Sequence, residues 1–135
     1  MARYSGFGLD YTFTASGDMG SYQYRFVRCA STGNPAKIEL ATGGSEPVAI
    51  GVLQNDPYSG GLANVRLYGV TKVYFSGSAA VSVGNLMTSG STGCAEVVNS
   101  DGSAFYGIAL EDMLAGTGYI SMLLLPNVTI ISGTT

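Results

Sequence analysis

Alternation of large apolar residues with polar or small ones runs through most of this chain and predicts β-strands. In the clearest run, Tyr22, Tyr24 and Phe26 share one face of the expected strand, while Gln23 and Arg25 share the other. The expected strands are Tyr11–Thr14, Tyr22–Cys29, Lys37–Ala41, Val48–Leu53, Asn64–Tyr68, Thr71–Phe75, Glu96–Val98, Phe105–Leu110, Tyr119–Leu125 and Val128–Ile131.

Short clusters of Gly, Asn, Asp, Ser and Pro separate these runs, as at Thr32–Pro35, Asn55–Pro57 and Asn99–Gly102. Glycine supplies positive φ, and Asn or Asp tolerates it. Many short strands with frequent turns predict an all-β fold, a single compact antiparallel barrel or sandwich of β-tulip or jelly-roll-like form. Helix is expected at most as single turns, at Ala79–Val83 and Leu110–Ala115.

The beginning of the chain mixes aromatic residues with glycine and shows no alternation. We therefore divide the chain into an extended N-terminal arm (1–15), a β-rich domain (16–131) and a disordered tail (132–135). Ordering such an arm costs about 1–2 kcal/mol per residue in backbone entropy, so it is expected to order against a partner. A frayed terminus is the alternative. The arm residues expected to make the contact are Arg3, Tyr4, Phe7, Leu9 and Tyr11.

The inward positions of the expected strands predict the core. Its members are Phe26, Val52, Leu53, Val65, Leu67, Val73, Phe75, Ile108, Leu110, Ile120, Met122 and Leu124.

The segment Ala49–Leu53 resembles Phe105–Leu110, since each places a glycine directly before Val or Ile. Two explanations are open: the same glycine-dependent crowding in two strands, and a true duplication. The first is favoured, because glycine inside a strand often marks close backbone approach.

Charge is scarce, at 11% of residues against a usual share of about 25%. Six basic residues face nine acidic ones, for a net charge of −3. The basic residues are Arg3, Arg25, Arg28, Lys37, Arg66 and Lys72. Their scatter argues against nucleic-acid binding, which needs clustered Lys and Arg. A surface this poor in charge favours coverage by protein partners.

The two cysteines, Cys29 and Cys94, lie far apart in the sequence. We expect small, buried, apolar thiols, with a disulfide between them as the alternative. The start of the chain lacks the apolar core of a signal peptide, and no run approaches the roughly 20 apolar residues of a membrane helix. We expect synthesis in the cytoplasm and no membrane contact.

The chain contains no histidine, which removes the usual general base and the commonest metal ligand. No phosphate-binding loop or nucleophile elbow occurs. Carboxylates fall mostly in expected turns: Glu39, Glu46, Asp56, Glu96, Glu111 and Asp112. We therefore expect no catalytic residue, no bound metal and no cofactor; the chain is not predicted to be an enzyme.

Five segments, in this order, resemble the small capsid decoration (cement) proteins of tailed bacteriophages. They are Gly51–Pro57, Ala63–Val73, Ala79–Gly84, Gly107–Glu111 and Gly118–Leu124. In that family the patterns Gly-Val-Leu-Gln-Asn-x-Pro, Val-x-x-Gly-x-x-Lys-Val, Val-x-x-Gly and Gly-Ile-Ala-Leu-Glu recur in this order; this chain has one residue more between Val65 and Gly69 than the second pattern. The similarity covers about residues 48 to 125, and the first 45 residues carry no motif of the family.

The resemblance implies a structural virion protein that binds the outer surface of a phage capsid and bridges subunits of the major capsid protein. It implies a homotrimer, with a dimer as the alternative, made in the host bacterial cytoplasm. No catalytic residue is carried over. After the arm, the next expected contact region is Asn55, Asp56, Pro57 and Tyr58. The competing hypothesis is a receptor- or carbohydrate-binding virion module, such as a small fibre or spike head.

Overall fold

The structure, a computed structural model, describes residues 8–30, 36–43, 48–98 and 104–130. Within these ranges it is all-β, which confirms the predicted class. The strands are β1 (Gly8–Ala15), β2 (Phe26–Cys29), β3 (Lys37–Leu40), β4 (Ala49–Leu53), β5 (Leu62–Gly77), β6 (Leu86–Ser89), β7 (Ala95–Val97), β8 (Ala104–Ala109) and β9 (Gly116–Ile130). No helix capable of crossing a membrane is present in the described ranges.

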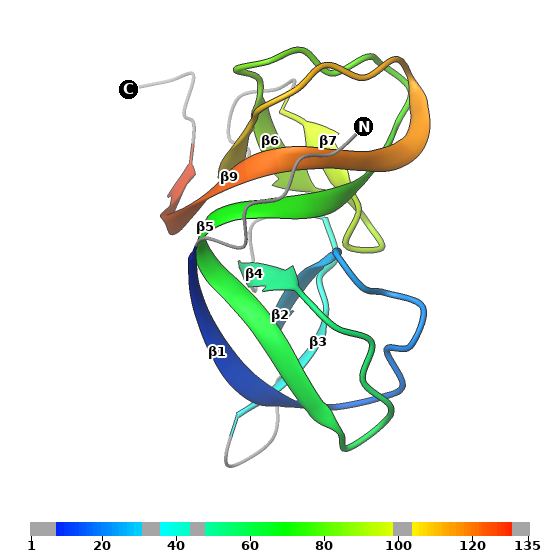
Figure 1. The fold of residues 1–135 in the computed structure, drawn as a ribbon, viewed down its shortest axis with the longest axis vertical. Coiled ribbons are helices and arrows are strands. Elements are labelled where there is room, and N and C mark those ends of the chain that lie inside the picture. The colour runs from blue at the N-terminus through cyan, green and yellow to red at the C-terminus, as the bar shows by residue number, and fades with distance from the viewer. Residues whose placement is uncertain (1–7, 31–35, 44–47, 99–103, 131–135) are drawn as a thin grey trace.

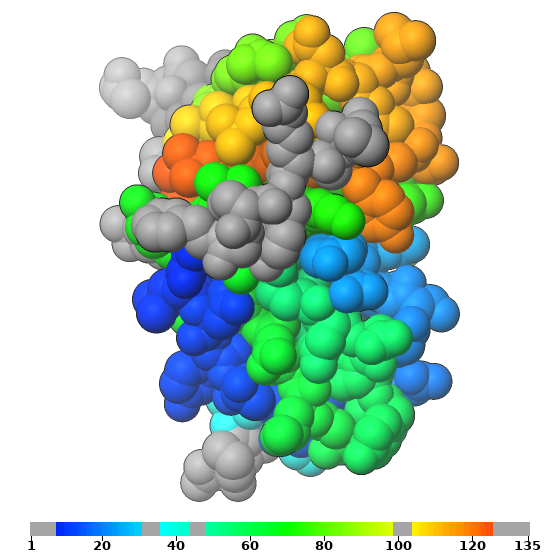
Figure 2. Space-filling model, viewed as in Figure 1, coloured from blue at the N-terminus to red at the C-terminus, as the bar shows by residue number. Residues whose placement is uncertain are grey.

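Strand pairing closes two five-stranded rings that share β5. The first ring runs β1–β3–β2–β4–β5 and closes through the β1–β5 pair. The second runs β5–β7–β6–β8–β9 and closes through the β5–β9 pair. Figure 1 shows the first ring below the second. Figure 2 shows the same division, with blue-to-green residues filling the lower half and yellow-to-orange residues the upper half.

The shared strand β5 changes partner at Gly69. This residue lies opposite Gly8 of β1 and also opposite Leu124 of β9. Its φ of 118° is one that residues with a side chain rarely adopt, and Figure 1 shows β5 bending sharply between the rings. The sequence predicted two strands here, Asn64–Tyr68 and Thr71–Phe75. That division was wrong, because glycine lets a single strand of 16 residues bend and continue.

The two rings have the same topology. Each contains one parallel pair, β1 with β3 and β5 with β7, and its other pairs are antiparallel. The register matches too, since Val27 lies opposite Gly51 in the first ring and Met87 opposite Gly107 in the second. Three backbone hydrogen bonds of the first ring each have an equivalent in the second ring. The bond from Tyr24 to Leu53 is equivalent to that from Gly84 to Ala109, the bond from Ala41 to Phe26 to that from Val98 to Leu86, and the bond from Gln54 to Asn64 to that from Leu110 to Ser121. The structure of the chain is therefore internally duplicated.

The similarity between Ala49–Leu53 and Phe105–Leu110 follows from this duplication. Gly51 and Gly107 occupy matching positions, and a Cβ at either would collide with backbone of the next strand, at the carbonyl oxygen of Arg66 or of Leu123. Crowding is thus real at both sites, but it recurs because the fold recurs. The crowding that the sequence favoured as the explanation is therefore present, at positions that the duplicated fold makes equivalent.

Six matching inward positions, each at most 1% exposed, fill the rings. In the first ring they hold Ala15, Val27, Ile38, Leu53, Ala63 and Val65, and in the second Phe75, Met87, Ala95, Ala109, Ile120 and Met122, in the same order. Four of the six exchange alanine for a large side chain between the rings. The two rings therefore share one arrangement of strands but place their large side chains at different inward positions.

The core prediction failed at three residues. Leu67 and Ile108 are half-buried and Leu110 is exposed, while the remaining nine predicted members are buried. In β8 the cause is an irregularity between Phe105 and Gly107, which shifts the alternation so that Ala109 points inward.

Other local predictions also need correction. The segment before Phe26 is a turn, and β6 was not predicted. Neither expected helical turn forms; instead Val81 and Met113 pair in an isolated bridge. Both cysteines are free, and Cys29 is exposed although Cys94 is buried.

Candidate interaction surface

The predicted arm is integrated into the fold where the structure describes it. Residues 8–15 are β1, which pairs with β5 from Gly8 to Thr14 and with β3 at its end. They are extended, but along the chain's own sheet, so a free arm would end at residue 7. Leu9 and Tyr11 are each 60% exposed. The other arm residues, Arg3, Tyr4 and Phe7, lie outside the described residues.

The predicted loop residues lie between β4 and β5 and have two kinds of role. Asn55 is structural, since its side chain donates to the Leu62 carbonyl at 2.9 Å and accepts from the Asn64 nitrogen at 3.0 Å. Pro57 is buried. Asp56 and Tyr58 are exposed, Tyr58 to 75%.

The arm and the loop are not brought together. Leu9 lies opposite Tyr68, at the far end of the β1–β5 pair from the loop, where Thr14 lies opposite Leu62. The second ring repeats the loop between β8 and β9, where Glu111 accepts from the Ser121 nitrogen at 3.0 Å. Figure 1 shows the two connections towards opposite ends of the long axis.

The sequence did not reveal a second grouping, which gathers four tyrosines and two cations at the joint between the rings. We call it the tyrosine–cation surface; it consists of Tyr22, Tyr24, Arg25, Lys72, Tyr74 and Tyr119. Five of its members are half-buried, and Tyr119 is 48% exposed. Alternation along β5 and β9 places Lys72, Tyr74 and Tyr119 on one face, but only the fold adds the turn before β2.

Ring geometry ties this surface together. The Arg25 guanidinium carbon lies 4.5 Å from the Tyr74 ring centroid and 5.2 Å from that of Tyr22. The Lys72 nitrogen lies 5.2 Å from the Tyr24 centroid. Edge-to-face contacts join the Tyr119 ring to Tyr24 at 5.9 Å and to Tyr74 at 5.4 Å. The cation-to-ring distances lie within the range of favourable cation–π contacts, and the ring-to-ring distances lie within the range of favourable aromatic pairs.

Tyr24 has a backbone conformation that is rare for its type. Its φ is 68°, the one positive value among non-glycine residues of the described chain. The matching residue of the second ring is Gly84, with φ 91°. A side chain there costs about 1–2 kcal/mol. The turn is anchored because Tyr24 donates to the Leu53 carbonyl at 2.7 Å and accepts from the Tyr74 nitrogen at 2.7 Å.

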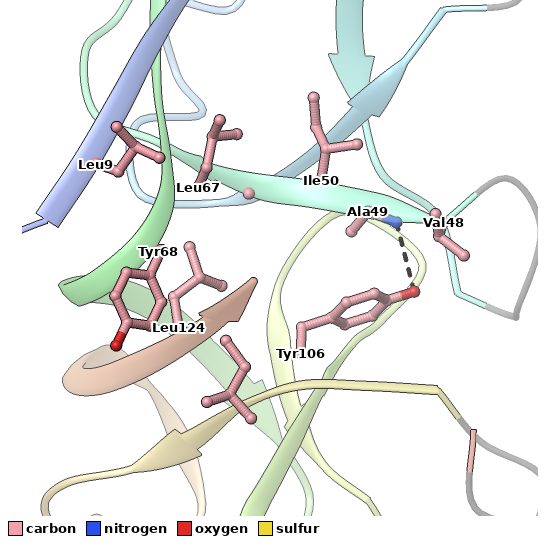
Figure 3. A pocket seen from close by; sticks show the side chains of 10 residues that line it. Leu9, Val48, Ala49, Ile50, Leu67, Tyr68, Tyr106 and Leu124 are labelled. Carbon is pink, nitrogen blue, oxygen red and sulfur yellow. Dashed lines mark hydrogen bonds between the residues drawn. The ribbon is translucent and has the colours of Figure 1, made fainter. Parts of the chain in front are cut away.

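An apolar cavity of about 340 Å³ lies between the rings. Figure 3 shows Ala49 of the first ring facing Tyr106 of the second, with the Ile50 side chain directed away from Tyr106 and Leu9 at one side. The Ala49 nitrogen donates to the Tyr106 hydroxyl at 3.4 Å. Because the described lining holds no carboxylate, amine or thiol, it offers little for acid–base or nucleophilic chemistry. Across the described ranges, no three His, Cys, Asp or Glu residues are gathered as metal ligands would be.

The class that this architecture defines is an all-β protein of two fused five-stranded rings. No protein-family model and no curated protein matches the sequence. The fold is similar to that of the head fibre gp8.5 N base of bacteriophage phi29, with a TM-score of 0.64. The match covers 90% of this chain and 97% of that chain at 19% identity. At this identity the likeness establishes a shared fold.

Proposed function

We propose that this chain is a structural protein of a phage virion that binds the outer surface of the capsid and bridges subunits of the major capsid protein. The observation that carries the proposal is the fold, which spans nearly all of a phage head-fibre base as well as nearly all of this chain. The order of sequence segments shared with capsid decoration proteins points the same way. The proposal includes no catalytic step, no cofactor, no nucleic acid and no membrane.

Bridging needs two contact regions, and the duplicated fold offers them. Tyr58 in the first ring and Leu114 in the second occupy matching places in the β4–β5 and β8–β9 connections, and they are 75% and 83% exposed. We take these two exposed side chains as the candidate contacts of the two regions. Two contacts on one chain strengthen binding, because the second becomes intramolecular once the first has formed.

The direct test mixes purified protein with heads assembled from a phage genome that lacks this reading frame, followed by sedimentation and imaging. We expect the protein to pellet with the heads and to appear at regular positions on the outer surface. Protein that stays in the supernatant at saturating concentration would refute capsid binding. Light scattering after size exclusion tests the proposed homotrimer against a dimer.

The arm is retained in the proposal with a shorter extent. Deleting residues 2–7 leaves every described strand intact, whereas deletion through residue 10 would remove the Asp10–Arg66 ion pair. We propose that the shorter deletion weakens head binding without lowering the melting temperature. Equal binding by the truncated and intact proteins would place the contact entirely on the described domain.

A second candidate is a fibre or spike module that binds a receptor or carbohydrate. The structural likeness to the base of a phage head fibre favours it. Copy number separates the two functions, since a decoration protein covers the shell in many copies and an adhesin is present in few. Quantitative gel analysis of purified virions measures this directly.

A further inference from the structure

We propose that the tyrosine–cation surface receives a carboxylate-bearing segment of a partner protein. Arg25 and Lys72 would bind the carboxylates, and the tyrosine rings would pack against the segment. Resting on the proposed function, the inference takes that partner to be a subunit of the capsid shell. It names the chemistry of the contact, which neither the fold nor the likeness to other proteins supplies.

Charge carries the first step. The described ion pairs are Arg28 with Glu39 and Arg66 with Asp10, and no described carboxylate lies within ion-pair distance of Arg25 or Lys72. In a chain of net charge −3, two cations on one aromatic surface, neither in a described ion pair, form a local site for anionic groups.

The geometry of Arg25 carries the second step. Its guanidinium lies over the rings of both Tyr22 and Tyr74, and its described hydrogen bond donates from Nη1 to the Thr92 carbonyl at 3.2 Å. Guanidinium has five N–H donors in a rigid fork suited to a carboxylate. Its contacts with two rings and one carbonyl restrict the position of the group in advance and so lower the entropy lost on binding.

The internal duplication carries the third step, because it shows what the frame requires by itself. The matching positions hold neither aromatic nor charged residues: Ser82 matches Tyr22, Gly84 matches Tyr24, Asn85 matches Arg25, Thr12 matches Lys72, Thr14 matches Tyr74 and Leu62 matches Tyr119. A ring of this fold therefore forms without this chemistry. Tyrosine and arginine are also the residues most enriched at protein interfaces.

The residue at position 24 agrees with an interaction role. Glycine suits its positive φ, and the second ring uses glycine there, yet the first ring retains tyrosine. Local backbone strain of this kind gathers at functional sites. The aromatic side chain of Tyr24 is the one that contacts both Lys72 and Tyr119.

The test compares head binding by Lys72→Thr and Lys37→Thr. Each variant removes one exposed or half-exposed lysine and changes net charge equally, but Lys37 lies on β3, outside the surface. We expect Lys72→Thr to weaken binding about fivefold and the double variant Arg25→Asn, Lys72→Thr about twentyfold or more, with Lys37→Thr near wild type. Raising salt should weaken wild type more than the double variant.

The outcomes separate this inference from the proposed function. If wild type binds heads and the two lysine variants bind equally, the surface is not the contact and the inference is wrong. If wild type does not bind heads at all, the proposed function fails first. Binding of wild type to host-cell polysaccharide, lost in the double variant, would assign the surface to a sugar and overturn the inference. Unchanged circular dichroism and melting temperature confirm that each variant is folded.

Discussion

The first ring and the second ring have the same strand topology, but four of their six equivalent inward positions exchange alanine for a large side chain. Where the first ring has Ala15 and Ala63, the second has Phe75 and Ile120, and where the first has Ile38 and Leu53, the second has alanines. Total volume is redistributed among the same strands, so no single side chain defines the topology. Cores tolerate such exchange when volume and pattern are preserved.

The features that do recur are backbone requirements. Gly51 and Gly107 permit close approach of neighbouring strands, and Gly60 and Gly116 both have positive φ in the matching connections. A turn or a close approach allows few alternatives, whereas an interior can be filled in many ways. The comparison therefore teaches that the fold is specified more by where glycine is needed than by which large residue fills each ring.

The largest effect is expected from emptying the second ring. Phe75→Ala removes a fully buried aromatic side chain and leaves a cavity, which costs about 3–5 kcal/mol. The first ring has alanine at the matching Ala15, but its space is filled by other residues. Urea denaturation followed by circular dichroism measures the loss. A loss below about 1 kcal/mol would show that the second ring collapses around the gap.

The next effect concerns an ion pair found in the first ring alone. Asp10 lies opposite Arg66, which is 4% exposed. Arg66 donates from Nε to Asp10 Oδ1 at 2.7 Å and from Nη2 to Asp10 Oδ2 at 3.1 Å. The matching pair in the second ring is Val70 opposite Leu123. Asp10→Val leaves a buried charge without its carboxylate, and we expect a cost of about 2–4 kcal/mol, moderated because Asp10 is partly exposed.

The double variant Asp10→Val, Arg66→Leu gives the first ring the second ring's pair. It should return to within about 1 kcal/mol of wild type, since an apolar pair often replaces a buried ion pair without loss. Chemical denaturation of both single variants and the double variant completes the cycle. If the double variant is as unstable as Asp10→Val, the rings are not interchangeable at this position.

Adding a methyl group at the matching glycines should destabilise both rings. Gly51→Ala and Gly107→Ala each place Cβ against a backbone carbonyl oxygen, of Arg66 and Leu123 respectively, and overpacking costs about 1–3 kcal/mol. The contact is closer at Gly51, so the first ring should lose more. Thermal melts of the two variants rank them, with Gly17→Ala, whose Cβ would meet open space, as control. The reverse ranking would mean that β5 moves away more easily than β9.

The smallest effects are expected at the positive-φ pair. Gly84→Ala meets open space, so its cost of about 1 kcal/mol comes from backbone strain alone. Tyr24→Gly removes the same strain but loses ring packing, and its stability should stay within about 1 kcal/mol of wild type. Melting temperatures of both variants test this. A large loss in Tyr24→Gly would assign the tyrosine a structural role at the joint and weaken its assignment to an interaction surface.

Local pattern was sufficient for the all-β class, for most turns and for the inward face of long strands such as β9, where Ile120, Met122 and Leu124 are buried as predicted. These features depend on residues close in sequence. Asp56 and Tyr58, which the sequence placed at a turn, are exposed, because a turn between two strands lies at the surface; their contact with a partner stays a prediction.

Only the tertiary structure decided that β5 belongs to two rings, that β1 is a strand of the first and that Tyr22, Tyr74 and Tyr119 meet. Each of these features depends on pairing between segments far apart in the chain. The partner of each strand is set by closure of the whole ring, because in a closed ring every strand edge is hydrogen-bonded to a neighbouring strand. The sequence determined which residues prefer extended structure and where the chain turns. The physical requirement to close two rings on one shared strand determined which of those residues became neighbours.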